Sequence, residues 1–278
     1  MKDTKIQWHP AFVAAMGLEL KQNRDDLIFE KEYNLNTKPL EIDLLVIKKS
    51  AAVQIISEIG RLFKGHNIVE YKSPEDHLNI DTFYKTLAYG CLYKSYGKTV
   101  DAIKAEDITI SILREAKPVE LFHYFKEHGC MITETCRGIY YIEGRTWFPT
   151  QIIVTSELNQ DSHEWLMALS GKLKKEDIQK LLGDRNSLTE KQDRDLADSV
   201  LEVSIGANKK IVDELIGDEN MYEVLMEIME PKLRVKRIQE AVDLLRDMNH
   251  TDVEIKATLM KRYELTESEA EEYIYSNV

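Results

Sequence analysis

Cysteines are few and long apolar runs are absent in this chain of 278 residues. The three cysteines are Cys91, Cys130 and Cys136. An odd number without metal-ligand spacing predicts buried or free thiols in a reducing cytoplasm. No run of about 18 apolar residues is present, which argues against a membrane-spanning helix. The first residues lack the basic and then apolar pattern of a signal sequence, so we expect a cytoplasmic protein without a membrane partner.

Motifs of several common enzyme classes are missing as well. The sequence contains no P-loop, no G-x-S-x-G and no G-x-G-x-x-G. Nucleotide-binding folds and serine hydrolases therefore gain no support from motifs. There is also no repeat of fixed period and no low-complexity segment, which argues against a repeat architecture.

The negative charge of the chain is concentrated in its C-terminal half. The net charge of the whole chain is -12, of which residues 1–156 carry -1 and residues 157–278 carry -11. A protein with this total is a poor nucleic-acid binder overall, but a nearly neutral half can still form a local basic groove. The charge therefore weakens a nucleic-acid function without excluding it.

Apolar spacing predicts an α/β protein followed by helices. We expect helices at 10–22, 79–95 and 119–128, and strands at 27–33, 40–47, 67–72, 107–115, 138–144 and 150–158. Residues 51–64 are ambiguous, because 53–56 fit a strand as well as a turn. After residue 158 the pattern is helical and acidic. We therefore expect a mixed central sheet flanked by helices at 1–158, and an acidic, all-helical domain at 159–278.

Three charged side chains on the predicted strands form a candidate site. Asp43 lies inside an apolar strand, where a carboxylate is costly unless it is paired or bound to a metal. Glu70 and Lys72 are two residues apart and share one face of a later strand. Mg²⁺ prefers one or two carboxylates together with water and phosphate oxygens. Asp43 and Glu70 would supply the carboxylates, the Tyr71 carbonyl a third oxygen, and Lys72 would assist the attacking water or stabilise charge on a phosphate.

The order Asp43, a gap, and then Glu70-x-Lys72, preceded by a helix that carries Glu19, resembles the PD-(D/E)XK nuclease superfamily. More narrowly, the chain is similar to the recombination-promoting-nuclease and transposase-associated branch of bacterial proteins, over residues 8–156 and in its closing helices. The resemblance implies a restriction-endonuclease-like core that hydrolyses DNA with Mg²⁺ or Mn²⁺, in recombination or mobile elements. It implies that Asp43 and Glu70 bind the metal, that Lys72 is catalytic, and that Glu19 is a further metal ligand.

The chain departs from this family pattern at two places. Many relatives carry a Gln or Tyr on the helix after the E-x-K strand, whereas this helix offers Asp81, Tyr84, Lys85 and Tyr89 and no Gln. The gap of 27 positions between Asp43 and Glu70 is long for a tight hairpin. It leaves Glu58 as a competing second carboxylate. We prefer Glu70, because the E-x-K pattern requires a lysine two residues after the glutamate. Glu70 is followed by Lys72 at that position, whereas Glu58 is followed by Gly60.

Several alternatives remain open at this stage. In the structural alternative to a metal site, Asp43 forms an ion pair with Lys72 or Arg61. Glu19 is then a solvent-exposed residue at the edge of its helix. The whole protein would then be a catalytically degenerate nuclease fold that acts as a binding or assembly module, with the acidic helices as its partner surface. Exposed helices of this kind also suit a homodimer through the C-terminal region.

Overall fold

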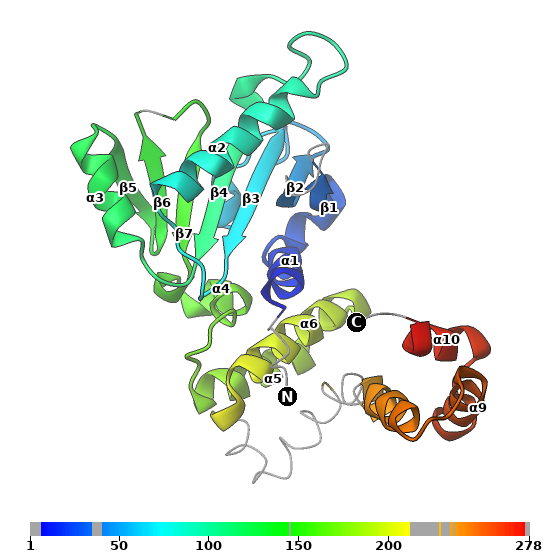
Figure 1. The fold of residues 1–278 in the computed structure, drawn as a ribbon. Coiled ribbons are helices and arrows are strands. Elements are labelled where there is room, and N and C mark those ends of the chain that lie inside the picture. Colours follow the sequence, from blue (N-terminus) through cyan, green and yellow to red (C-terminus); the bar gives the residue numbers. More distant parts are fainter. Residues whose placement is uncertain are drawn as a thin grey trace. The chain divides into compact units, whose positions relative to one another are not determined.

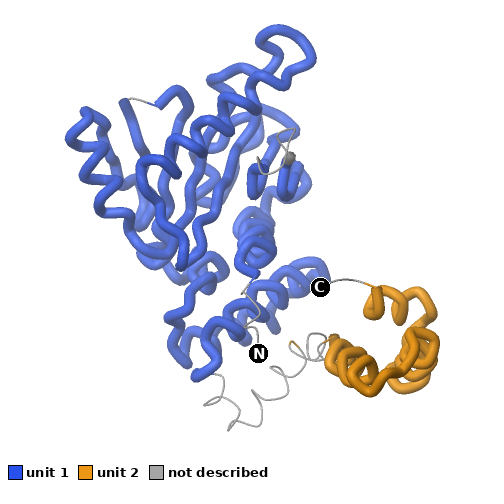
Figure 2. Tube along the Cα trace, in the orientation of Figure 1, with its two compact units in different colours: residues 1–215 blue, residues 216–278 orange. Residues whose placement is uncertain are grey.

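The structure is a computed structural model that describes residues 7–34, 41–144, 146–211, 228, 234–235 and 237–275. The chain divides into two compact units, Met1–Leu215 and Ile216–Val278, which Figure 2 shows in different colours. We expected the boundary after residue 158. Helices α4 (Gln160–Met167), α5 (Lys175–Ser187) and α6 (Lys191–Ala207) instead belong to the first unit, because α4 and α6 pack on α1 (Trp8–Glu19).

A mixed sheet forms the centre of the first unit (Figure 1). In the described residues it has seven strands in the order β1-β2-β3-β4-β7-β6-β5. The strands β3, β4 and β7 are parallel to one another, and the other neighbours are antiparallel. Their bounds are β1 Leu27–Asn34, β2 Glu41–Lys48, β3 His66–Lys72, β4 Ile108–Arg114, β5 Met131–Cys136, β6 Ile139–Glu143 and β7 Thr150–Val154. The expected α/β class with a mixed, helix-flanked sheet is confirmed.

Helices cover both faces of this sheet. On one face, α2 (Ile80–Ser95) and α3 (Val119–Glu127) share a core with Ile68, Ile110 and Ile112. On the other face, Phe12 of α1 stacks on Tyr71 with ring centroids 4.9 Å apart. Because side chains alternate along a strand, Glu70 projects towards the α2 and α3 face and Tyr71 towards α1.

Helix α1 is buried on nearly all sides, which explains its weak amphipathic pattern. It lies between the sheet on one side and α4 and α6 on the other. Eight of its twelve residues are buried. The helix begins two residues earlier than we predicted, and Glu19 is its last residue.

The connection between β2 and β3 contains no strand, although residues 53–56 fitted one. All of residues 51–64 are described, and a 3₁₀ turn at Ile59–Leu62 is their regular element. Gln151 anchors this turn to the sheet by donating from Nε2 to the Ile59 carbonyl at 2.8 Å. Gly60 is required by close packing, because a Cβ atom there would lie 2.1 Å from Ile55 Cγ2. The long gap before Glu70 is therefore an irregular connection that reaches across the sheet to Gln151 of β7.

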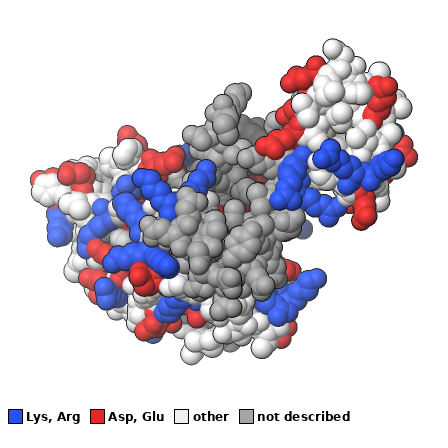
Figure 3. All heavy atoms as spheres, turned by 90° about the horizontal axis from the view of Figure 1, so that it is seen from below, with Lys and Arg blue, Asp and Glu red and all other residues white. Residues whose placement is uncertain are grey.

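The described part of the second unit is helical, as expected. Helices α9 (Asp252–Tyr263) and α10 (Glu267–Tyr275) pack around Ile255, Leu259 and Ile274. Both basic and acidic side chains are exposed on this unit in Figure 3, so the visible face is not uniformly negative. Within the described ranges, no helix of either unit is long and apolar enough to cross a membrane.

Candidate active site at the ends of β2 and β3

Strands β2 and β3 separate at Asp43, and this separation creates the site. The two strands pair from Ile47 opposite His66 to Leu44 opposite Val69. Beyond that point the Asp43 carboxylate replaces a ladder bond, because its Oδ2 accepts from the backbone N–H of Tyr71 at 2.8 Å. On the other side of Asp43, the register places Glu32 opposite it, and Glu32 has a left-handed φ of 47°. Such strained residues bend a strand and are common at functional sites.

Glu70 and Lys72 form an ion pair beside Asp43. Lys72 Nζ donates to Glu70 Oε1 at 2.8 Å. The side chain of Lys72 is 14% exposed and that of Glu70 is 6% exposed. The second carboxylate oxygen, Oε2, is buried and has no hydrogen-bond partner in the described residues. A buried oxygen with a partial charge and no donor is costly. Lys72 and the backbone of Asp43 both interact with this carboxylate, but Oε2 itself accepts no hydrogen bond in the described residues.

The electrostatics of the pair agree with this geometry. Burial raises the pKa of the Asp43 carboxyl to about 6, against the lowering effect of the Tyr71 N–H. Burial and then the nearby Asp43 charge raise the pKa of Glu70 to about 7. Burial alone would lower the pKa of the Lys72 ammonium, but Glu70 and Asp43 outweigh it and raise that pKa. Two carboxylates and one ammonium leave an excess negative charge that a cation would neutralise.

Three further ionisable residues lie near Asp43. His9, at the start of α1, places Nε2 at 3.6 Å from Asp43 Oδ2. Asp76 follows β3 and accepts from the backbone N–H and Oγ of Ser73 at 3.2 and 2.7 Å. Lys85 of α2 interacts electrostatically with Asp43. The sequence did not indicate His9 or Asp76 as site residues, because neither lies on a predicted strand with Asp43 or Glu70.

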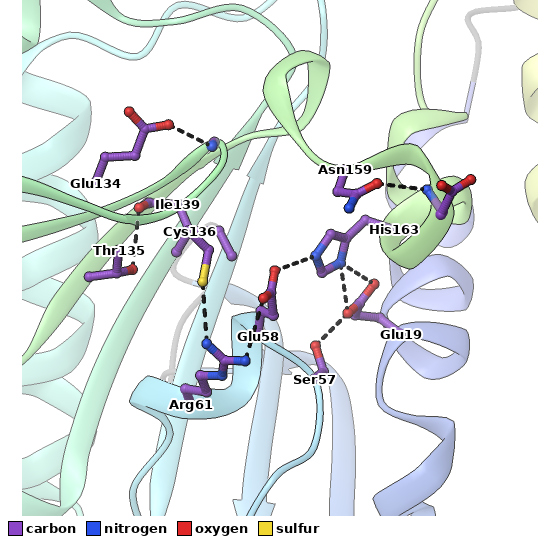
Figure 4. Close-up of polar contacts among 12 residues, drawn as sticks. Glu19, Ser57, Glu58, Arg61, Glu134, Thr135, Cys136, Ile139, Asn159 and His163 are labelled. Atoms are coloured by element: carbon purple, nitrogen blue, oxygen red, sulfur yellow. Dashed lines mark hydrogen bonds and ion pairs between the residues drawn. The ribbon is translucent and has the colours of Figure 1, made fainter.

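The structure does not bring Glu19 into this site (Figure 4). Its carboxylate accepts from Ser57 Oγ and contacts His163 Nδ1 at 3.0 and 3.1 Å. Ten residues of helix, or about 15 Å, separate Glu19 from His9, which contacts Asp43. Glu19 also lies on the α1 face of the sheet, whereas Glu70 projects to the opposite face. The structure therefore does not bring Glu19 together with Asp43 and Glu70.

Glu58 belongs to the same separate cluster as Glu19. Its Oε2 lies 3.4 Å from His163 Nε2, and its Oε1 lies 3.4 Å from Arg61. Arg61 also donates to Cys136 Sγ at 3.3 Å, so it is not the ion-pair partner of Asp43. The choice of Glu70 over Glu58 as the carboxylate beside Asp43 agrees with the structure.

The oxygen atoms of Asp43 and Glu70 are of the type that a hard divalent cation prefers. Within the described ranges, no group of three or more His, Cys, Asp or Glu side chains could hold a metal ion. Mg²⁺ needs fewer protein ligands, since water and substrate oxygens complete its octahedron. The two carboxylates are desolvated, and Glu70 Oε2 has no donor. This donor set suits Mg²⁺ or Mn²⁺ better than a soft metal.

No family model, curated protein or solved structure matches the chain. The function of this protein is therefore inferred from the geometry of the site itself.

The raised pKa values of Asp43 and Glu70 predict how stability depends on pH. Both folded values lie above the unfolded ones of 3.8 and 4.5, so the folded state binds protons more tightly. Their contribution to the free energy of unfolding is complete below about pH 4 and is lost as the pH rises through about 7. In EDTA we expect the loss to be several kcal/mol, because each unit by which a folded-state pKa is raised corresponds to about 1.4 kcal/mol.

Urea unfolding of the wild type and of the Asp43→Asn, Glu70→Gln double variant measures this effect. The difference between the two proteins should change between pH 4.5 and 7.5, with the variant gaining relative stability as the pH rises. His163 titrates in both proteins, so the subtraction removes its contribution. A difference that stays constant over this range would contradict the assignment of the raised pKa values.

Proposed function

We propose that this protein is a metal-dependent nuclease that hydrolyses DNA phosphodiester bonds. The observation that carries the proposal is the buried Glu70 oxygen without a donor, beside Asp43 and the Lys72 ammonium. Two desolvated carboxylates and a lysine at a strand end suit hydrolysis of an anionic ester. The element order around them, a helix and then three antiparallel strands followed by a helix and a parallel strand, supports a restriction-endonuclease-like core.

Each residue of the site has a distinct role in this proposal. Asp43 and Glu70 would hold Mg²⁺ or Mn²⁺, and the Tyr71 carbonyl would be a third oxygen ligand. The bound metal supplies Lewis-acid stabilisation of charge on the phosphate. The Tyr71 N–H holds the Asp43 carboxylate in position. Lys72 is positively charged beside Glu70, so it would orient the attacking water and stabilise negative charge that develops on the phosphate.

Cleavage of DNA tests this proposal directly. Purified protein should nick or cut plasmid and linear DNA with Mg²⁺ or Mn²⁺, and EDTA should stop the reaction. The Asp43→Ala variant should have no activity above background, because one of the two carboxylate ligands of the metal is lost. Activity that is equal in the variant and the wild type would refute the site, and activity that persists in EDTA would refute the metal.

A binding module without catalysis is the second candidate function. The lack of three or more clustered metal-binding side chains in the described residues favours it, as does the ion pair that already engages Glu70. In that case Asp43, Glu70 and Lys72 would be a structural cluster. DNA binding without cleavage in either metal would support this candidate.

A further inference from the structure

A pocket lies next to the candidate site, between the two connections that follow β3 and β4. His77 and Asn79 line it from the β3–α2 connection, and Arg114 and Lys117 line it from the β4–α3 side. In open α/β sheets, ligands bind outside the carboxyl ends of parallel strands. The carboxyl ends of β3 and β4 lie at the lower edge of the sheet in Figure 1. The pocket therefore occupies a position typical of a ligand site.

Arg114 has a charge that no described group of the chain neutralises. Its Nε is buried and has no hydrogen-bond partner, and no ion pair joins its guanidinium to a carboxylate in the described parts of the chain. Arg114 is partly buried, so one nitrogen of its guanidinium is removed from water while no described carboxylate is paired with it, and a nearby anion would stabilise it. The guanidinium fork also matches the oxygens of a phosphate, which accept two parallel hydrogen bonds.

Lys117 is the second cation of the pocket. Its Nζ donates to Tyr140 Oη at 2.5 Å and lies 3.4 Å from Glu157. These contacts hold the ammonium at the side of the pocket. Glu120 is the one carboxylate among the lining residues of this pocket. Lys117 is paired with Glu157, so Arg114 is the cation of the lining that has no ion-pair partner in the described residues.

The register of the sheet connects this pocket to Lys72. Lys72 is paired with Arg114 across the parallel strands β3 and β4. Paired residues of adjacent strands project to the same face and are about 5 Å apart. Glu70, Lys72 and Arg114 therefore share the α2 and α3 face of the sheet. An anion bound to Arg114 would therefore lie beside Lys72, on the face of the sheet that also carries the proposed metal ligand Glu70.

We propose that this pocket binds a phosphate group of the polynucleotide, with Arg114 as its main cationic contact. The chemical class of the ligand, a phosphate oxyanion, follows from the unpaired guanidinium and the second cation. Its source as nucleic acid rests on the proposed function. The phosphate is either an internal phosphodiester next to the bond that is cut or a phosphate at the end of a strand.

Fluorescence anisotropy with labelled 20-mers in EDTA tests this inference without cleavage. Three versions of one oligonucleotide are used, with a 5′-phosphate, with a 3′-phosphate and with hydroxyl groups at both ends. Arg114→Gln should weaken binding about tenfold, and the salt dependence should fall by about one phosphate contact. The matched control is Arg194→Gln, which removes the same charge from an exposed position on α6 and should bind as the wild type does.

The pattern across the three oligonucleotides identifies the source of the phosphate. An equal loss for all three indicates an internal phosphodiester, and a loss confined to one phosphorylated end indicates a terminal phosphate. Binding of all three by Arg114→Gln at wild-type affinity would overturn the inference. Arg114→Lys keeps the charge and should recover part of the affinity, so a folding defect of the glutamine variant does not hide the result.

The same measurements separate this inference from the proposed nuclease activity. If the wild type does not cleave DNA but its binding depends on Arg114, the nuclease proposal fails and the phosphate pocket stands. If the wild type cleaves DNA and Arg114→Gln binds normally, the pocket fails and the nuclease stands. Inorganic phosphate should also raise the melting temperature of the wild type more than that of Arg114→Gln, and an equal rise would count against the pocket.

Discussion

Replacing Glu70 by glutamine is expected to reduce DNA cleavage by at least about 10³-fold while making the metal-free protein more stable. The two effects have one cause. At pH 8 the Glu70 carboxylate is ionised and buried, although its pKa is raised to about 7, so loss of its charge removes an unfavourable repulsion with Asp43. The same charge is needed to hold a cation, and loss of a group that stabilises the reacting phosphate costs several kcal/mol of barrier.

The matched control for this experiment is the same substitution at Glu19, a second carboxylate that is nearly fully buried. Glu19→Gln should lower the free energy of unfolding by about 1–3 kcal/mol, because it disturbs hydrogen bonds with Ser57 and His163. It should leave cleavage close to the wild-type rate. General damage to the fold would not explain a Glu70→Gln variant that is more stable but inactive together with a Glu19→Gln variant that is less stable but active. A large loss of cleavage in Glu19→Gln would return Glu19 to the site.

Replacing Lys72 by methionine is expected to reduce cleavage by about 10²- to 10⁴-fold without weakening metal binding. Methionine keeps the length and the apolar part of the side chain, so it removes mainly the ammonium. Without this charge, the phosphate loses an electrostatic contact, and the attacking water loses its orienting donor. Metal affinity should be maintained or increase, because Glu70 Oε1 is released from its ion pair.

Single-turnover cleavage together with calorimetric metal titration measures both parts of the Lys72 prediction. Lys126→Met is a suitable control, since Lys126 is exposed on α3. That variant should cleave and bind metal as the wild type does. If Lys72→Met cleaves at the wild-type rate, Lys72 has only a structural role in the ion pair with Glu70.

Much of the first unit can be predicted from local patterns in the sequence. Strands β2, β3 and β4 and helix α2 are clear because apolar residues recur with regular spacing and end at polar turns. Strand β5 carries no such signal: four of its six residues are exposed and none is buried, so the alternation that marks a strand is absent. Helix α1 is buried on nearly all sides, so its sequence does not indicate which face Glu19 occupies.

The candidate site is partly predictable for a similar reason. Glu70 and Lys72 share a face because of spacing alone, and Asp43 is conspicuous among apolar neighbours. Which elements meet around them depends on the register between strands that are far apart in the sequence. Local patterns do not contain that register, so they did not place His9 beside Asp43, Arg114 beside Lys72 or Glu19 beside His163.

Titration of the protein with Mn²⁺ in a calorimeter is the most direct test of the central claim that Asp43 and Glu70 form a metal site. The wild type should bind Mn²⁺ at neutral pH, and binding should disappear in Asp43→Asn and in Glu70→Gln. Mg²⁺ should compete for the same site, and Glu19→Gln should bind Mn²⁺ normally. Absence of binding in the wild type, or equal binding in Glu70→Gln, would contradict the metal site and the nuclease function proposed from it.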